Sequence, residues 1–181
     1  TTEDIEAALD RIKRFAEPRV RRLLVIEDNE AERLSISALI GHDDVEIVPA
    51  ATGHEALERL RDESFDCAVL DLSLPDMSGF DLLQEVQGDE RLRDLPIVVF
   101  TGRDLDQDDA RLLGRMAKSI VIKGAQSPER LLDETALFLH RVVGNLPERQ
   151  RHMLESLYTS NEALDGKRVL VVDDDIRNIF A

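Results

Sequence analysis

The chain has 181 residues, of which 43% are hydrophobic, and its 38 acidic and 23 basic side chains give a formal net charge of −15. This length and composition can bury the core of one full-sized domain, and no apolar run approaches the roughly 20 residues needed to cross a bilayer. The acidic charge argues against non-specific binding to nucleic acid or to an anionic membrane surface.

The first predicted element is a short amphipathic helix within residues 1–17, which ends at Pro18. Its apolar side chains recur three or four residues apart, at Ile5, Ala8, Leu9, Ile12 and Phe15. We assign residues 1–20 to a helical linker. Because the chain opens with Thr1 and shows no signal peptide, we expect it to be a piece of a longer protein.

Five short, mainly apolar runs follow, and each is interpreted as a buried strand. They occupy residues 23–26, 45–48, 67–70, 97–100 and 120–122, and a helical pattern follows each one. Thr52 and Glu55 are spaced as a capping box at the start of the second of these helices. Ser127 is predicted to cap the last one, which starts at Pro128 and runs to about Val143.

This alternation of strands and helices predicts an α/β fold with a doubly wound, five-stranded parallel sheet and helices on both faces. The single cysteine, Cys67, lies in the third apolar run, and we interpret it as a small core residue. One cysteine forms no internal disulfide, which fits a reducing compartment, and we expect a cytoplasmic location.

Polar side chains follow four of the predicted strands, namely Glu27-Asp28, Asp71, Thr101 and Lys123. Because ligands bind at the carboxyl ends of parallel strands, we expect these groups at one edge of the sheet. Clustered carboxylates repel each other unless a hard cation such as Mg²⁺ offsets their charge. A carboxylate can also attack phosphorus, with Mg²⁺ and Lys123 neutralising the transferring oxygens. Thr101 offers a hydroxyl to a phosphoryl oxygen, and Gly102 leaves room for that group.

Each of these residues also has an ordinary structural explanation when taken alone. Acidic residues after strands often cap the next helix, a Lys at a strand end is usually solvated, and Thr is common in strands. The joint arrangement at the ends of the first, third, fourth and fifth strands nevertheless favours a functional site. The scattered histidines are interpreted as surface or helix-flank residues: His42, His54, His140 and His152.

Residues 22–143 resemble the response-regulator receiver family of two-component signalling. In that family an acid pair ends the first strand, a phospho-accepting Asp ends the third, and a Gly follows in the next loop. A Thr or Ser ends the fourth strand, and a Lys ends the fifth. The matching positions in this sequence are Glu27-Asp28, Asp71, Gly79, Thr101 and Lys123. The resemblance implies the flavodoxin-like strand order 2-1-3-4-5.

The resemblance also implies a chemistry for these positions. It implies Mg²⁺ or Mn²⁺ held by Asp28, Asp71 and the backbone carbonyl of Ser73, with Glu27 acting largely through water. It implies phosphoryl transfer to Asp71 from a phosphohistidine on a histidine kinase core or a histidine phosphotransfer domain. Positions that tune hydrolysis of the aspartyl phosphate are occupied by Ser73, Gly102 and Arg103.

The sequence departs from the family pattern at three positions. Gly124 stands where the family commonly has Pro after Lys123. A cis bond before a non-proline residue costs roughly 2.5–4 kcal/mol, so we expect a trans bond and a differently shaped loop. Ile120 stands where an aromatic residue often turns inward on activation, which argues against output through a rotating ring. The acid pair is Glu-Asp rather than Asp-Asp, a change that is common in the family.

The end of the chain repeats its beginning, because residues 167–174 read Lys-Arg-Val-Leu-Val-Val-Asp-Asp and match the pattern of residues 21–28. We therefore predict a receiver at residues 21–144, a helical linker at 145–166, and at 167–181 the first strand of a second, truncated receiver with the acid pair Asp173 and Asp174. The linker is predicted to be helical from Pro147 to about Tyr158. Its apolar residues are expected to form part of a partner surface with the preceding helix: Met153, Leu154 and Leu157.

Tandem receivers resemble the C-terminal part of hybrid histidine kinases, which would make the parent protein a sensor histidine kinase that can carry a membrane anchor elsewhere. These residues contain no histidine-bearing dimerisation helix, no Gly-rich ATP-lid motif and no basic DNA-reading helix. We therefore expect at most weak self-dephosphorylation as catalysis. The expected partners are a kinase core or a histidine phosphotransfer domain, and the second receiver, without nucleic acid or direct membrane contact.

Three functions compete at this point. The first is a phosphorelay receiver that uses Asp71 and Mg²⁺. The second is a receiver that is not phosphorylated and regulates an attached kinase sterically, which Ile120 and Gly124 motivate. The third, a metal-dependent phosphatase with an Asp nucleophile, is weak because those enzymes usually place a second Asp where this chain has Ser73.

Overall fold

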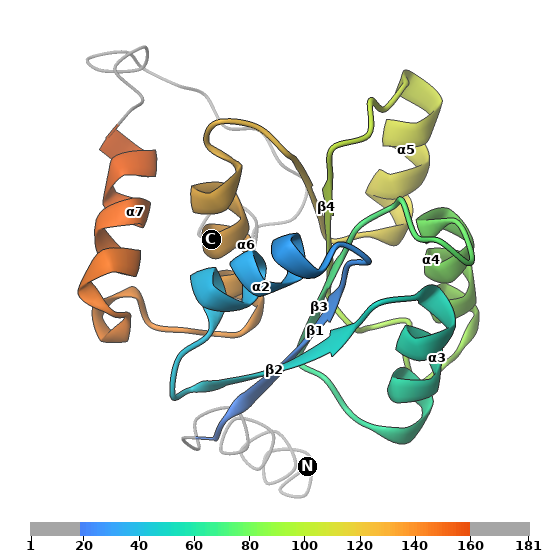
Figure 1. The fold of residues 1–181 in the computed structure, drawn as a ribbon, viewed down its shortest axis with the longest axis horizontal. Helices are drawn as coiled ribbons and strands as arrows, with labels where there is room; N and C mark the ends of the chain where they lie inside the picture. Colours follow the sequence, from blue (N-terminus) through green and yellow to red (C-terminus); the bar gives the residue numbers. More distant parts are fainter. Residues whose placement is uncertain (1–18, 160–181) are drawn as a thin grey trace, which may run out of the picture.

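The structure is a computed structural model that describes residues 19–159. In this part of the chain five parallel strands form one sheet in the order β2-β1-β3-β4-β5 (Figure 1). The strands are β1 (Arg21–Ile26), β2 (Val45–Ala50), β3 (Cys67–Leu70), β4 (Ile97–Thr101) and β5 (Ser119–Ile122). This order confirms the predicted doubly wound fold and puts β1 and β3, whose ends carry the acidic residues, side by side.

Helices cover both faces of the sheet. One face carries α2 (Glu30–Ile40) and α6 (Ser127–Phe138), and the other carries α3 (Gly53–Asp62), α4 (Gly79–Gly88) and α5 (Gln107–Met116) (Figure 1). Strand β1 serves both layers, because alternate side chains point to opposite faces. Leu23 packs in the core under α2 and α6, while Leu24 packs in the core under α3 and α4. The buried Cys67 lies in the first of these cores, as predicted.

The helix starts show where local sequence rules apply and where they do not. Asn29 caps α2 by accepting the backbone N–H of Ala31 at 3.0 Å, and Thr52 caps α3 by accepting that of Glu55 at 3.1 Å. The prediction that Ser127 caps the helix after β5 was wrong. Its hydroxyl instead binds the N–H and the carbonyl of Gly124, so it fixes the loop after β5.

The segment after α6 also differs from the prediction. The helix ends at Phe138 rather than near Val143, and His140 adopts a left-handed backbone with φ 52°. A short 3-10 turn (Val143–Asn145) and a further helix, α7 (Glu148–Thr159), follow in the segment predicted to be a helical linker. The apolar stripe misled the prediction because Val142, which is 65% exposed, continues its spacing without belonging to the core.

Helix α7 folds back against α6 and α2 (Figure 1). Leu154, which is 1% exposed, packs with Leu132 of α6 and with Leu146. The side-chain amide of Gln150 donates to the carbonyl of Leu39 at 2.8 Å. Leu154, one of the side chains expected to serve a partner surface, is therefore buried within the chain itself. The predicted helix within residues 1–17 and the predicted second receiver at 167–181 lie outside the described residues.

Candidate functional site

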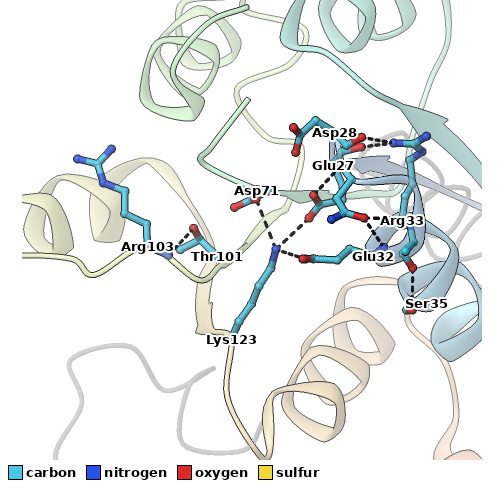
Figure 2. A network of polar contacts seen from close by, with 11 residues as sticks. Glu27, Asp28, Glu32, Arg33, Ser35, Asp71, Thr101, Arg103 and Lys123 are labelled. Atoms are coloured by element: carbon cyan, nitrogen blue, oxygen red, sulfur yellow. Dashed lines mark hydrogen bonds and ion pairs between the residues drawn. The ribbon is translucent and has the colours of Figure 1, made fainter. Parts of the chain in front are cut away.

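The acidic cluster forms because β1 and β3 are neighbours in register. Ile26 pairs with Leu70, and the N–H of Asp71 donates to the carbonyl of Ile26 at 2.9 Å. The residues that follow each strand therefore meet at the carboxyl edge of the sheet (Figure 2). Carboxylate oxygens of Glu27, Asp28 and Asp71 all lie within 4.8 Å of one another. The structure brings these three residues together as the strand ends suggested.

Glu27 is the most deeply buried member of the cluster, with 1% exposure. Its carboxylate accepts the N–H of Asn29 at 3.1 Å and the ammonium of Lys123 at 3.0 Å. Burial raises the pKa of Glu27 above its usual 4.5, although both hydrogen bonds act in the opposite direction. Glu27 is thus occupied by partners within the protein, whereas Asp28 is exposed to solvent.

Lys123 follows β5 and joins the cluster from across the sheet. Its ammonium lies 2.5 Å from Glu32, 3.0 Å from Glu27 and 3.4 Å from Asp71 (Figure 2). The ammonium also lies 5.3 Å from the centre of the Phe100 ring. Burial disfavours the charged amine, but hydrogen bonds to Glu32 and Glu27 outweigh that effect and hold the pKa of Lys123 well above its ordinary value. The amine therefore carries a fixed positive charge.

Thr101 ends β4 and is fully buried beside Lys123, whose backbone N–H donates to the Thr101 carbonyl at 2.8 Å. The Thr101 hydroxyl oxygen accepts the N–H of Arg103 at 3.2 Å. The Arg103 guanidinium extends away from Asp71, over the Phe80 ring at 5.5 Å (Figure 2). A methyl group on Gly102 would meet Lys123 at an ordinary 3.6 Å, so space alone does not require glycine there.

The loop after β3 is held in a tight shape. Ser73 and Ser78 form an isolated bridge, and the N–H of Gly79 donates to the carbonyl of Leu72 at 3.0 Å. A Cβ on Gly79 would lie 2.7 Å from the Leu72 Cα, which a folded backbone does not tolerate. This glycine lets the loop turn back directly behind Asp71. Ser73 is exposed on the same loop, two residues past Asp71.

Two residues of α2 belong to the site and were missed from the sequence. Glu32 makes the 2.5 Å contact with Lys123 described above. The guanidinium of Arg33 donates to the carbonyls of Glu27, at 2.5 Å, and Asp28, at 3.1 Å. Each is a charged residue in the first turn of a helix, which has no distinctive local pattern. Only the length of the loop after β1, which brings α2 back over the strand end, points to them.

The donor set fits a hard divalent cation. Such cations take carboxylate and carbonyl oxygens and retain several waters. Asp71 is only 7% exposed, and one of its carboxylate oxygens, Oδ1, is buried without a hydrogen-bond partner in the protein. A buried carboxylate oxygen that lacks a donor is costly unless something positive or polar occupies the adjoining space. Asp28 and Asp71 therefore offer carboxylate oxygens to a cation, and Glu27 adds a third negative charge beside them.

Comparison with known proteins decides the family. The model of the response regulator receiver domain matches residues 23–136. The chain belongs to this family. Transcriptional regulatory protein AfsQ1 of Streptomyces coelicolor is 33% identical to this receiver over 111 residues, which are 61% of this chain and 47% of AfsQ1. The polar-differentiation response regulator DivK of Brucella ovis is 28% identical over 92 residues, or 51% of this chain and 75% of DivK.

The receiver spans about half the length of AfsQ1 and most of the length of similar solved structures. The phosphorylated cyanobacterial phytochrome response regulator RcpA matches with a TM-score of 0.61 and 24% identity, over 67% of this chain and 96% of RcpA. The Mn²⁺-bound form of response regulator Rcp1 matches with a TM-score of 0.60 and 21% identity, over 70% of this chain and 99% of Rcp1. These two likenesses show the shared fold.

Two further expectations can be compared with the described residues. The peptide bonds among them are all trans, including the bond before Gly124, as the missing proline suggested. Ile120 packs at the margin of the core under α4 and α5. Between residues 19 and 159, no helix is long and apolar enough to cross a membrane.

Proposed function

We propose that this receiver accepts a phosphoryl group on Asp71 within a phosphorelay. The observation that carries the proposal is the setting of Asp71, which is buried between an acid pair and a fixed ammonium with one carboxylate oxygen unpartnered in the protein. The arrangement combines a nucleophilic carboxylate with compensating positive charge. It suits the transfer of a highly charged group better than it suits helix capping or core packing.

The transfer is a displacement at phosphorus. An oxygen of Asp71 forms the new bond to phosphorus while the bond from phosphorus to the donor nitrogen breaks, and the imidazole of the donor histidine leaves with the bonding electrons. The Lys123 ammonium would stabilise the negative charge on the phosphoryl oxygens. The Thr101 hydroxyl, which now accepts the N–H of Arg103, has its own hydrogen available for one of those oxygens.

A divalent cation, Mg²⁺ or Mn²⁺, would be held by Asp28, Asp71 and the backbone carbonyl of Ser73. Bound there, it would neutralise charge on the phosphoryl oxygens and offset repulsion among the carboxylates. Glu27 would act through water, because its carboxylate is already engaged by Lys123 and Asn29. Ser73, Gly102 and Arg103 would then influence how water reaches the aspartyl phosphate. This role agrees with the exposure of Ser73 and with the outward path of Arg103.

The wider context that we propose is a hybrid histidine kinase in the cytoplasm, with the receiver at residues 21–144, a helical linker at 145–166 and a second receiver from residue 167. The repeat of the pattern of residues 21–28 at residues 167–174 supports it. The phosphoryl donor would be a histidine kinase core or a histidine phosphotransfer domain of the same pathway.

The test is the intact-protein mass after incubation with acetyl phosphate and Mg²⁺, for the parent chain, Asp71→Asn and the control Asp81→Asn. Asp81 is an exposed carboxylate in the first turn of α4. We expect one phosphoryl adduct on the parent and on the control, and none on Asp71→Asn. An adduct on Asp71→Asn would place the acceptor elsewhere. The absence of an adduct on all three, also with a phosphohistidine donor, would contradict the proposal and favour a receiver that regulates a kinase only by docking.

A further inference from the structure

The shortest contact of Lys123 is not with the proposed acceptor. Its ammonium lies 2.5 Å from Glu32 and 3.4 Å from Asp71. The three partners also differ in exposure, since the side chain of Glu32 is 46% exposed, against 2% for Glu27 and 9% for Asp71. Glu32 therefore reaches the ammonium from the solvent side and draws it toward α2 (Figure 2).

The first turn of α2, which carries Glu32, is attached to the site by several hydrogen bonds. Asn29 accepts the N–H of Glu32 itself at 3.2 Å. Arg33, the next residue, donates to the carbonyls of Glu27 and Asp28. These bonds tie the backbone that carries Glu32 to the strand end that carries the acid pair. The backbone at Glu32 is therefore fixed relative to the strand end beside Asp71.

An ammonium has three N–H donors, and here all three have a carboxylate partner. An incoming phosphoryl oxygen can gain Lys123 only if one carboxylate gives it up. Glu32 is the partner that water can solvate again at least cost, because the other two are buried. The contact with Glu32 is thus the one that breaks when a phosphoryl group arrives.

We propose that Glu32 is a positioning residue that draws the Lys123 ammonium toward itself in the resting receiver and leaves Asp71 as its most distant carboxylate partner. The proposal rests on the function proposed above for Asp71. Glu32 leaves the Asp71 carboxylate more open to a divalent cation. At the same time it withholds the ammonium from a phosphoryl group until that group competes for it. No feature of the local sequence marks this role, since the two residues are 91 positions apart.

The proposal gives the substitution Glu32→Gln two opposite effects. Without the Glu32 charge, the ammonium moves onto Asp71 and Glu27 and competes with the cation. The dissociation constant for Mg²⁺ is then expected to rise by about two- to fivefold, the size of a partly exposed ion pair. The affinity for beryllium fluoride, an anionic analogue of a phosphoryl group, is expected to increase by a similar factor of about two to five, because Lys123 is released in advance.

The experiment compares the parent chain, Glu32→Gln and Glu30→Gln. Calorimetry reports Mg²⁺ binding, and fluorine NMR reports beryllium fluoride binding at saturating Mg²⁺. Glu30 is a matched control, since it lies in the same first turn of α2 and is exposed. We expect Glu30→Gln to leave both affinities close to those of the parent. Equal behaviour of Glu32→Gln and Glu30→Gln would overturn the proposal, as would weaker binding of both ligands to Glu32→Gln.

A double-mutant cycle with Lys123→Met separates the contact from the general loss of a charge. In the Lys123→Met background there is no ammonium to hold, so Glu32→Gln should change Mg²⁺ affinity no more than Glu30→Gln does. A full-sized effect in that background would overturn the positioning role. A parent chain that gains no phosphoryl adduct from acetyl phosphate or from a phosphohistidine donor refutes the proposed function itself. An adduct on the parent with no difference between the two variants refutes only the role of Glu32.

Discussion

The carboxylate of Asp76 accepts the backbone N–H of His54 at 2.9 Å, so the loop that follows β3 caps α3, a helix that precedes it in the chain. The same carboxylate accepts the N–H of Gly53 at 2.9 Å and contacts the His54 ring. Two open donors at the start of α3 are satisfied in this way. The Asp71 loop is thereby anchored to a neighbouring helix rather than held by its own residues alone.

Loss of this cap should destabilise the receiver in a pH-dependent manner. We expect Asp76→Ala to lower the free energy of unfolding by about 1 kcal/mol at neutral pH. Although burial opposes ionisation, the hydrogen bonds from His54 and Gly53 hold the pKa of Asp76 below its usual 3.8. The stabilisation is therefore complete above that value and is lost as the pH falls through the lower folded-state pKa. Urea unfolding of Asp76→Ala and of the exposed control Asp94→Asn, at neutral and acidic pH, measures the difference.

The glycine behind Asp71 gives a steric prediction. Because a Cβ at Gly79 would lie 2.7 Å from the Leu72 backbone, we expect Gly79→Ala to cost about 1–3 kcal/mol of stability. Gly88 ends the same helix and has open space where its Cβ would be, so Gly88→Ala should be neutral or slightly stabilising. The denaturant midpoints of the two variants test this prediction, and that of Gly79→Ala is expected to be the lower. Equal midpoints would show that the loop can shift without cost.

Tyr158 reports on the position of α7. Its hydroxyl donates to the Asp133 carboxylate of α6 at 2.5 Å, and this bond, with some burial, raises the pKa of Tyr158 to about 12. The stabilisation from this bond is present below the ordinary pKa of 10 and is lost as the pH rises through about 12. Since the chain has one tyrosine, its ultraviolet absorbance gives the titration directly. We expect Asp133→Asn to return the pKa toward its ordinary value, and a parent that already titrates there would show that α7 is not docked.

The small apolar cluster under α7 gives a second measure of that docking. Leu154 is buried against Leu132 and Leu146, so Leu154→Ala should cost about 2–3 kcal/mol. Leu137, on the exposed side of α6, is 52% exposed and provides the control, since Leu137→Ala should cost far less. The unfolding free energies of the two variants, measured under the same conditions, test the prediction. Similar small losses would mean that α7 contributes little to the stability of the receiver.

The acidic cluster should make stability depend on Mg²⁺. Binding to the folded state alone stabilises it by about 2.7 kcal/mol when the cation is at 100 times its dissociation constant. We expect Asp28→Asn to abolish most of this increase, because Asp28 is the exposed carboxylate of the cluster. Without Mg²⁺ the same variant should be slightly more stable than the parent, since one of three like charges is gone. Thermal unfolding with and without Mg²⁺ measures both effects.

The sheet and its edge could be predicted because buried parallel strands are continuous apolar runs. A polar residue that directly follows such a run lies at the carboxyl edge of the sheet, independently of how the helices pack. Asp71 and Lys123 could be placed in this way. Glu32 and Asp76 could not, because their partners lie 91 and 22 residues away and their local patterns are those of an ordinary helix turn and an ordinary loop. Contacts of this kind depend on loop geometry, which the apolar pattern does not encode.

The end of α6 shows the opposite failure, because the local apolar pattern predicts a longer helix than the structure contains. The apolar spacing continues to Val142, yet that residue is 65% exposed and follows the left-handed turn at His140. After this turn the chain folds back, and Leu154 of α7 covers apolar surface of α6 at Leu132. Burial by a later segment satisfies the same hydrophobic requirement that a longer helix would have met.

Docking of α7 has a mechanical consequence. Because Gln150, Leu154 and Tyr158 attach it along its length, α7 is held against α2 and α6 from near its first turn to near its last. A helix joined to the sheet only by a flexible linker would move independently of it, whereas a helix attached at three points moves with its neighbours. A small movement of α2 or α6 would then be passed on to α7 as a whole. Helix α7 is thus mechanically coupled to the helices that cover one face of the sheet.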